Sequence, residues 1–150
     1  MRVDLTHECE LILGEVIASG RRLNDEHFAF SRLSSQTYIY RDAEPLLFDN
    51  IQWQPKTQNM LALGQMEGFS HQAGLYYVNT AADFRGAEVY QRLAEYLDAM
   101  QQQNGQAILL GVSHPSPSLC VVRGLAHHAE LLQNILTECS HILMRDRVID

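Results

Sequence analysis

The sequence predicts an α+β fold, with β-rich sheet layers and two amphipathic helices in the C-terminal half. Three observations lead to this class. Several short segments of the first half alternate apolar and polar residues, which is the period of a strand. Two later segments repeat apolar residues at intervals of three and four, as helices with one buried face do. The resulting order of strands, helix, hairpin and helix is typical of helices packed on a β layer.

Length and composition are those of a single globular domain over residues 1–150. A chain of 150 residues can bury a substantial core, and a hydrophobic fraction of 46% argues against disorder. The net charge of −7, with one lysine, argues against nucleic acid and against anionic membranes as partners. No apolar run reaches the length of a membrane span, and the N-terminus lacks the apolar core of a signal peptide. We therefore expect a cytoplasmic protein.

The first half of the chain predicts strands. Residues 10–20 form an apolar run with β-branched side chains that ends at Ser19-Gly20. In "TYIYRDAEPLLFDN" (residues 37–50), two strand-like segments flank a group of turn residues, which predicts a hairpin. One face of the returning strand carries Leu47, Asp49 and Ile51. A polar connector follows at residues 54–60, and "GLYYV" predicts a further strand.

The second half predicts two helices around a hairpin. Thr80 and Asp83 have the spacing of a helix cap, and apolar residues then recur at three and four up to Leu97. Asn104-Gly105 ends this helix in the manner of a left-handed C-cap. Two strands, "QAILLGV" and "SLCVVRG", surround the turn "SHPSP". The final helix has the strongest amphipathic pattern, a single stripe over residues 128–143.

Histidines and cysteines give weak signals for metal binding. His127 and His128 are adjacent, so on a helix their rings point about 100° apart and do not converge on one ion. His7 and Cys9 share one face of a strand, but two ligands do not make a metal site. The three cysteines are an odd number at wide spacings, which predicts reduced, mostly buried thiols.

Cys120 and His114 flank the predicted hairpin turn and form the candidate nucleophile pair of a small hydrolase. Cys120 lies in a β-core pattern, where an apolar setting raises the pKa of a thiol and makes it unreactive. No phosphate-binding loop of the GxGxxG or GxxxxGK[ST] type occurs in the sequence. These residues therefore give little support to catalysis, and none to a tightly bound cofactor.

Two carboxylates inside predicted strands are the strongest candidates for function. Glu15 lies within "LILGEVIASG" and Asp49 within "EPLLFDNI". An acid in a strand of core residues is costly unless it is paired or faces water. One alternative is that both acids face solvent on a half-exposed sheet. The other is that they line a wet interior path, where their oxygens would be weak, hard ligands for a passing divalent cation.

The order of segments over nearly the whole chain resembles the C-terminal half of the D-type urease accessory proteins (UreD, also called UreH). That family has an acid on a strand, a Gly-Arg step, a glutamate and an aromatic, and then a hairpin with an acidic turn. The positions that carry the resemblance are Glu15, Gly20, Arg21, Glu26 and Phe28, followed by Asp42, Glu44, Pro45, Leu46, Leu47 and Asp49. Downstream, a "GxSxxxxxLxVR"-like hairpin precedes the last amphipathic helix.

The resemblance implies a non-enzymatic role in urease maturation, and thereby in nitrogen metabolism. It implies a chaperone-like complex with the F-type and G-type accessory proteins that docks on apo-urease and helps nickel to reach the active site. The G-type partner would hydrolyse GTP, which agrees with the lack of a phosphate loop here. By position, Glu15 and Asp49 would lie on a transient Ni²⁺ path. The alternatives are a protein-binding adaptor without a metal role, or an inactive fragment of the family.

Overall fold

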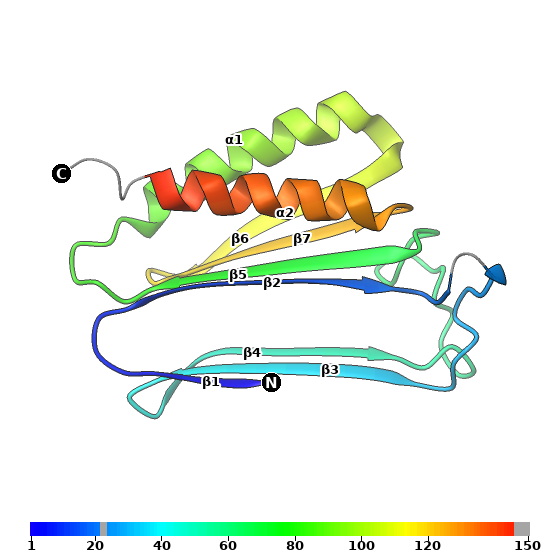
Figure 1. Ribbon diagram of the computed structural model, residues 1–150, viewed down its shortest axis with the longest axis horizontal. Coiled ribbons are helices and arrows are strands. Elements are labelled where there is room, and N and C mark those ends of the chain that lie inside the picture. Colours follow the sequence, from blue (N-terminus) through cyan, green and yellow to red (C-terminus); the bar gives the residue numbers. More distant parts are fainter. Residues whose placement is uncertain (22–23, 146–150) are drawn as a thin grey trace.

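The chain folds into three stacked layers, two sheets and a pair of helices, which confirms the predicted α+β class (Figure 1). A computed structural model describes residues 1–21 and 24–145. The lower layer is a three-stranded sheet of order β1-β3-β4. It contains β1 (Arg2–Leu5), β3 (Leu33–Arg41) and β4 (Glu44–Trp53). β1 runs parallel to β3, and β4 returns antiparallel to it.

The middle layer is a four-stranded antiparallel sheet of order β2-β5-β7-β6. Its strands are β2 (Glu10–Ala18), β5 (His71–Asn79), β7 (Leu119–Ala126) and β6 (Ile108–Ser116). The upper layer consists of α1 (Gly86–Asn104) and α2 (Ala129–Met144), and the short 3₁₀ turn η2 (Gly105–Ala107) follows α1. Both helices cover the face of the middle sheet that points away from β1, β3 and β4 (Figure 1).

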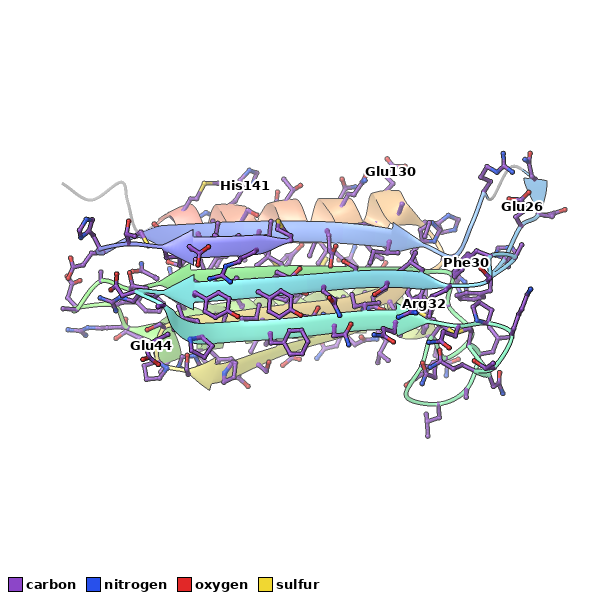
Figure 2. All side chains as sticks on the ribbon, turned by 90° about the horizontal axis from the view of Figure 1, so that it is seen from below. Glu26, Phe30, Arg32, Glu44, Glu130 and His141 are labelled. Atoms are coloured by element: carbon purple, nitrogen blue, oxygen red, sulfur yellow. The ribbon has the colours of Figure 1, made fainter. Side chains whose placement is uncertain are left out.

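The β3–β4 hairpin follows the sequence prediction closely. Its two-residue turn, Asp42-Ala43, has positive φ at both residues (48° and 68°), a conformation that matches the twist of the flanking strands. The outer face of this sheet is drawn in Figure 2, with Glu44 at the turn end. Phe28 and Phe30 precede β3, and their rings pack against Trp53 with centroids 5.8 and 6.4 Å from it.

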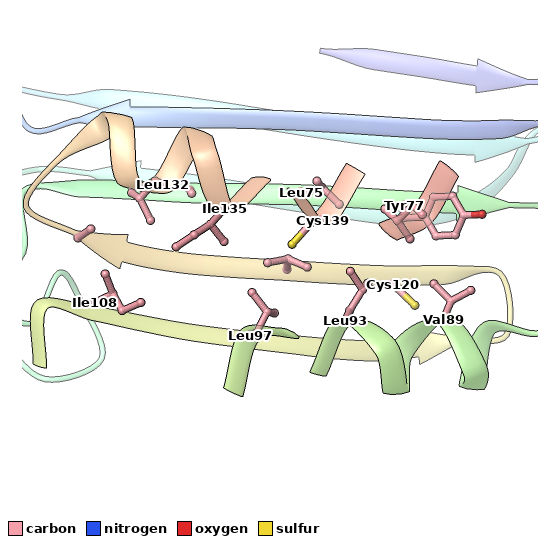
Figure 3. Packing of buried hydrophobic residues seen from close by; sticks show 14 residues of the cluster. Leu75, Tyr77, Val89, Leu93, Leu97, Ile108, Cys120, Leu132, Ile135 and Cys139 are labelled. Atoms are coloured by element: carbon pink, nitrogen blue, oxygen red, sulfur yellow. The ribbon is translucent and has the colours of Figure 1, made fainter. Parts of the chain in front are cut away.

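The helix-facing core joins the helices to the middle sheet (Figure 3). It contains fully buried leucines of both helices, Leu93 from α1 and Leu132 from α2. The expected three- and four-residue spacing is therefore what buries each helix on the sheet. Cys120 and Cys139 belong to this core and are free thiols, as predicted. Cys9 is also free and is half-buried.

The predicted cap of α1 is wrong. The helix begins at Gly86, and Arg85 precedes it without a side-chain capping bond. Thr80 instead accepts a hydrogen bond from the Cys9 amide (2.9 Å) and lies 3.2 Å from the His7 carbonyl oxygen. Its hydroxyl is thus used to fix the β1–β2 connection. The helix ends at Asn104 as predicted, but Gly105 is not the predicted left-handed cap, because its φ of 56° is combined with a ψ of −126°.

Gly86 sets the position of this helix start against the β6–β7 turn. A Cβ placed on Gly86 would lie 2.4 Å from the carbonyl oxygen of Pro117 and 2.5 Å from His114 Cε1. Contacts that short do not occur between real side chains and backbone, so only glycine permits this approach. The helix layer is therefore fixed to the turn that links the last two strands of the middle sheet.

Candidate functional site

The space between the two sheets is apolar at both ends and polar in the middle. At one end Ile39, Val78 and Val121 form a buried cluster, and at the other Ile51, Trp53 and two methionines form a second one. Between them the inward positions of five strands are polar or lack a side chain. We call this band the inter-sheet polar belt; it comprises Glu15, Ser35, Thr37, Asp49, the Tyr76 hydroxyl, Gly74 and Arg123.

Asp49 lies in this belt and joins the two sheets. Its carboxylate, on β4, accepts hydrogen bonds from Arg123 on β7 at 2.6 Å (Nη2 to Oδ1) and 3.3 Å (Nη1 to Oδ2). The hydroxyl of Tyr76, on β5, donates to the same Oδ2, and Arg123 Nη1 lies 3.3 Å from the Tyr76 oxygen. This two-bonded pairing of arginine with carboxylate is the strong form of an ion pair. We call these three residues the cross-sheet clamp.

The clamp changes the ionisation of its own members. Burial raises the pKa of Tyr76 above its ordinary value, and the hydrogen bond to Asp49 raises it further, so the phenol stays neutral. Burial is the largest single influence on Arg123 and opposes its charge, but the hydrogen bonds to Asp49 and Tyr76 and the charges of these two groups together outweigh burial, so the pKa of the guanidinium is raised. The side chain of Asp49 is 15% exposed and that of Arg123 is 40% exposed, so the clamp reaches solvent from the arginine side.

Glu15 also points into the inter-sheet space, from β2. Its Oε2 lies 3.5 Å from the hydroxyl of Ser35 on β3, which can donate to it. Its Oε1 is buried and has no hydrogen-bond partner among the described residues. A buried carboxylate oxygen without a partner carries a desolvation cost, which is the kind of exception that functional sites contain.

The strand register places Glu15 and Arg123 in one row of the middle sheet. Glu15 is paired with Gly74, Gly74 with Arg123, and Arg123 with Gly111. Gly74 leaves room here, because a Cβ on it would come within 3.5 Å of both the Tyr76 hydroxyl and Arg123 Nη1. Of the two alternatives for these acids, this geometry favours side chains that point between the sheets over side chains that face free solvent.

The clamp forms part of the wall of an open cleft. The cleft has a volume of about 540 Å³ and lies between the edge of β4 and the inner faces of β6 and β7. Asp49 and Arg123 lie at one side, Trp53 and Gln72 contribute to the wall, and Gly111 lines the β6 side. Solvent therefore reaches the guanidinium of Arg123, whereas Glu15 does not line this cleft.

Within residues 1–21 and 24–145, no three histidine, cysteine or acidic side chains are grouped closely enough to hold a metal ion. His7 and Cys9 do not form such a group, and His127 packs its ring against Phe69 with centroids 4.9 Å apart. Glu15 and Asp49 are thus a pair of oxygen ligands at most, and one of them is already paired with an arginine.

The geometry around Cys120 disfavours a nucleophile pair. Its Sγ lies 3.7 Å from His114 Nδ1, but Nδ1 is also 3.0 Å from the carbonyl oxygen of Leu119. That oxygen can only accept a hydrogen bond, so Nδ1 carries the proton and is not a base for the thiol. Burial raises the pKa of the Cys120 thiol to about 11, which leaves it protonated and unreactive near neutral pH.

The two buried thiols predict a loss of stability in alkali. Burial raises the pKa of Cys120 to about 11, and burial with the charge of Glu138 raises that of Cys139 to about 12, both from 9. Because the folded-state values are raised, the stabilisation is complete below pH 9 and is lost as pH rises towards 11–12. We expect each thiol to lower the free energy of unfolding by about 1 kcal/mol per pH unit above pH 9.5.

Urea unfolding at pH 8, 9.5 and 10.5 measures this slope for the wild type and for Cys120→Ala and Cys139→Ala. Each variant should lose less stability between pH 9.5 and 10.5 than the wild type, whatever its stability at pH 8. An equal loss of stability in all three proteins would contradict the raised pKa values, because the thiols would then ionise as readily in the folded state as in the unfolded state.

Sequence reasoning found two members of the inter-sheet belt and missed the partner of one of them. Arg123 occupies an inward strand position between Val121 and Leu125, which is the same signal that singled out Asp49 between Leu47 and Ile51. A single charge at the inward position of an apolar strand therefore marks Glu15, Asp49 and Arg123 alike. Tyr76 gives no such signal, because a tyrosine in a core strand is ordinary.

The Gly-Arg step that follows β2, together with the glutamate and the aromatic residue after it, shapes a loop and does not form part of the inter-sheet polar belt. Gly20 and Arg21 follow β2, and a Cβ on Gly20 would lie 2.3 Å from the carbonyl oxygen of Glu26. Arg21 and Glu26 form an ion pair at 3.1 Å, and the Phe28 amide donates to the Ser19 carbonyl at 2.7 Å. The motif thus closes a tight loop that brings Phe28 onto Trp53.

None of the described helices is long and apolar enough to cross a membrane.

Comparisons with known proteins point to one family. Residues 1–149 match the family described as "UreD urease accessory protein". The chain is 38% identical over 148 residues to the urease accessory protein UreD of Haemophilus influenzae (strain PittGG), covering 94% of this chain and 52% of that protein. It is 36% identical over 141 residues to UreD of Actinobacillus pleuropneumoniae serotype 5b (strain L20), covering 94% and 51%. The chain spans about half the length of these curated relatives.

Proposed function

The chain belongs to the UreD urease accessory protein family, and from this we propose that it takes part in urease maturation. In this proposal it is a non-enzymatic, cytoplasmic subunit that helps Ni²⁺ to reach apo-urease. Its partners would be the F-type and G-type accessory proteins and apo-urease itself. Nickel would be the cargo of the complex and not a resident cofactor of this chain.

The partnerless oxygen of Glu15 is the observation that supports a cation route most strongly. Oε1 is buried between the sheets without a hydrogen-bond partner among the described residues. A hydrated divalent cation would satisfy that oxygen, and Ni²⁺ accepts carboxylate and water oxygens. Binding by one or two carboxylates is weak, which suits an ion that must leave again.

Asp49 would act differently from Glu15. Both of its oxygens already accept hydrogen bonds from Arg123, so a cation that uses Asp49 has to compete with the guanidinium. Arg123 is 40% exposed and lies beside the cleft, so it can turn towards solvent when it is displaced. In the absence of nickel, the arginine supplies the positive charge that keeps Asp49 stable in the belt.

The test replaces each acid by its uncharged isostere. We expect Glu15→Gln and Asp49→Asn, combined in one variant, to lower urease activation about tenfold or more at limiting nickel. The reason is that amide oxygens bind a divalent cation more weakly than carboxylates do. Urease activity is measured in cells that express the urease and accessory genes with this chain as their UreD protein. Glu44→Gln, on the exposed hairpin end of β4, is the matched control.

Nickel dependence separates the outcomes. The control should match the wild type at every nickel concentration, and excess nickel should partly restore the double variant. Full activation by the double variant at limiting nickel would remove the cation route. Failure of the wild-type chain to support any activation would contradict the role in urease maturation itself.

The pairing of Asp49 with Arg123 favours a second candidate, an adaptor that acts through protein contacts alone. Both carboxylate oxygens are occupied, and the clamp then serves to hold the sheets together. An adaptor predicts that the double variant binds the F-type partner and activates urease with the nickel dependence of the wild type. An inactive fragment predicts neither binding nor activation.

A further inference from the structure

The two carboxylates of the inter-sheet polar belt have one arginine between them. Both oxygens of Asp49 accept hydrogen bonds from Arg123. The Oε1 atom of Glu15 is buried and has no hydrogen-bond partner among the described residues. The other oxygen of Glu15 lies 3.5 Å from the Ser35 hydroxyl, which is the length of a weak hydrogen bond. Glu15 is therefore a buried acceptor that lacks a strong donor.

Arg123 is within reach of both acids. In the middle sheet, β2, β5 and β7 lie side by side (Figure 1), and the register places Glu15, Gly74 and Arg123 in one row across them. Neighbouring strands lie about 4.8 Å apart, so the Cα atoms of Glu15 and Arg123 are about 10 Å apart. Extended arginine and glutamate side chains together span this distance. Glu15 contacts β3 and Arg123 contacts β4, so both side chains project into the space between the sheets.

Gly74 keeps the path between the two side chains open. A Cβ placed on Gly74 would lie 3.5 Å from Arg123 Nη1, so the guanidinium already extends over the glycine. The Tyr76 hydroxyl lies 3.4 Å from the same point and 3.3 Å from Nη1. That hydroxyl can therefore stay in contact with the guanidinium when the guanidinium moves across the row. Because the residue between Glu15 and Arg123 is a glycine, no side chain of this row separates them.

We propose that Arg123 has two positions in the belt. In the first, which the structure shows, it pairs with Asp49. In the second it lies over Gly74 and pairs with Glu15, and it takes this position when the charge of Asp49 is removed or is taken up by a bound cation. The move exchanges one arginine–carboxylate pair for another, so the guanidinium keeps a charged partner. It also supplies the missing donor of Glu15 Oε1.

Asp49 is the preferred partner while it is charged. It accepts two hydrogen bonds from the guanidinium and a third from the Tyr76 hydroxyl. Glu15 offers one unoccupied oxygen and the oxygen beside Ser35. The larger number of bonds at Asp49 holds Arg123 there, and Arg123 is thus a positioning residue that decides which carboxylate is open.

The shift of Arg123 does not depend on nickel. Its consequence for cation transfer rests on the proposed function: an ion at Asp49 would send the arginine to Glu15, and an ion at Glu15 would leave the arginine on Asp49. The two carboxylates would then serve a passing cation one at a time. The guanidinium would also repel a second ion from the belt, because like charges at short range oppose one another.

Double-mutant cycles in two backgrounds test the shift without metal. Glu15→Gln, Arg123→Met and their combination are made in the wild type and in Asp49→Asn, which keeps the shape of the side chain but turns one acceptor into a donor. Urea unfolding in the presence of a chelator gives the unfolding equilibrium constant of each variant. In the wild-type background the two effects should multiply to within about twofold, since the residues are not in contact. In the Asp49→Asn background they should depart from the product by at least about fivefold.

A crystal structure of the Asp49→Asn chain gives a second readout. We expect a guanidinium nitrogen of Arg123 within about 3 Å of Glu15 Oε1. This measurement needs a single conservative substitution, so it decides the question even where a combined variant does not fold.

Gly74→Ala tests the path over the glycine. The contacts of the new Cβ would be 3.4 Å or longer, so the chain should fold, but the methyl group fills the space that the guanidinium must enter. In the Asp49→Asn background it should reduce the coupling of Glu15 with Arg123 to about twofold or less. Gly14→Ala is the matched control, because its Cβ would lie on β2, on the helix side, 3.5 Å from Leu136. It should leave the coupling unchanged.

Three results would overturn the proposal. The first is independent effects of Glu15→Gln and Arg123→Met in the Asp49→Asn background. The second is a structure of the Asp49→Asn chain in which Arg123 still contacts position 49 and water satisfies Glu15. The third is a coupling that Gly74→Ala leaves at full size, because the guanidinium would then not pass over the glycine. None of these results bears on urease activation, which the nickel dependence described above tests separately.

Discussion

Replacing Leu132 by alanine is expected to lower the free energy of unfolding by about 2–5 kcal/mol. Leu132 is fully buried between α2 and the middle sheet, and its Cδ2 would lie 3.1 Å from a Cβ placed on Gly124. Removing three carbons there leaves a cavity that the rigid sheet below cannot close. Urea unfolding followed by circular dichroism measures the change, and the midpoint should fall without a change in slope.

The matched control for this substitution is Leu63→Ala, which deletes the same atoms at a position 90% exposed. It should change stability by less than about 0.5 kcal/mol. A loss below about 1 kcal/mol at Leu132 would contradict tight packing between α2 and the middle sheet.

The second large effect concerns the cross-sheet clamp. Asp49→Ala should lower the free energy of unfolding by about 1–3 kcal/mol, because it leaves the Tyr76 hydroxyl and the Arg123 guanidinium without their acceptor. The larger loss of stability that follows when a fully buried ion pair loses one partner is not expected here. Arg123 is 40% exposed, and water in the cleft can solvate its guanidinium. Thermal or urea unfolding measures this loss.

A double-mutant cycle with Arg123→Met tests whether the pair acts as a unit. The combined variant should be less destabilised than the sum of the single variants, with a coupling of about 0.5–3 kcal/mol. Arg2→Met with Asp4→Ala gives the comparison cycle, because that pair is exposed on both sides and lies on one strand. Additive losses at Asp49 and Arg123 would show that the clamp does not join the sheets.

Much of the fold follows from local patterns in the sequence. The β3–β4 hairpin, the β6–β7 hairpin and both helices are encoded by periodicity and turn residues that act over a few positions. The same alternation places Asp49 on one strand face with Leu47 and Ile51, but it left open whether Glu15 and Asp49 point inward or face solvent. The start of α1 could not be predicted this way, because Thr80 has the residue type of a cap but bonds to the distant Cys9.

The contacts between the two sheets cannot be predicted from the residue pattern of a single strand. Asp49 and Arg123 are 74 residues apart, and their meeting depends on which strand of one sheet lies over which strand of the other. The exposure of the inner face of β6 depends on the difference between a three-stranded and a four-stranded sheet, which is a property of the whole topology. A charge at an inward position shows that a partner is needed, but not which partner it is.

The inter-sheet polar belt separates two apolar clusters in the interior between the sheets. Contacts around Ile39 at one end and around Trp53 at the other form distinct clusters with no shared residue. A substitution that disturbs the packing around Trp53 is therefore expected to leave the packing around Ile39 in place. The Asp49–Arg123 pair lies between these two clusters and is the charged contact that links the sheets there.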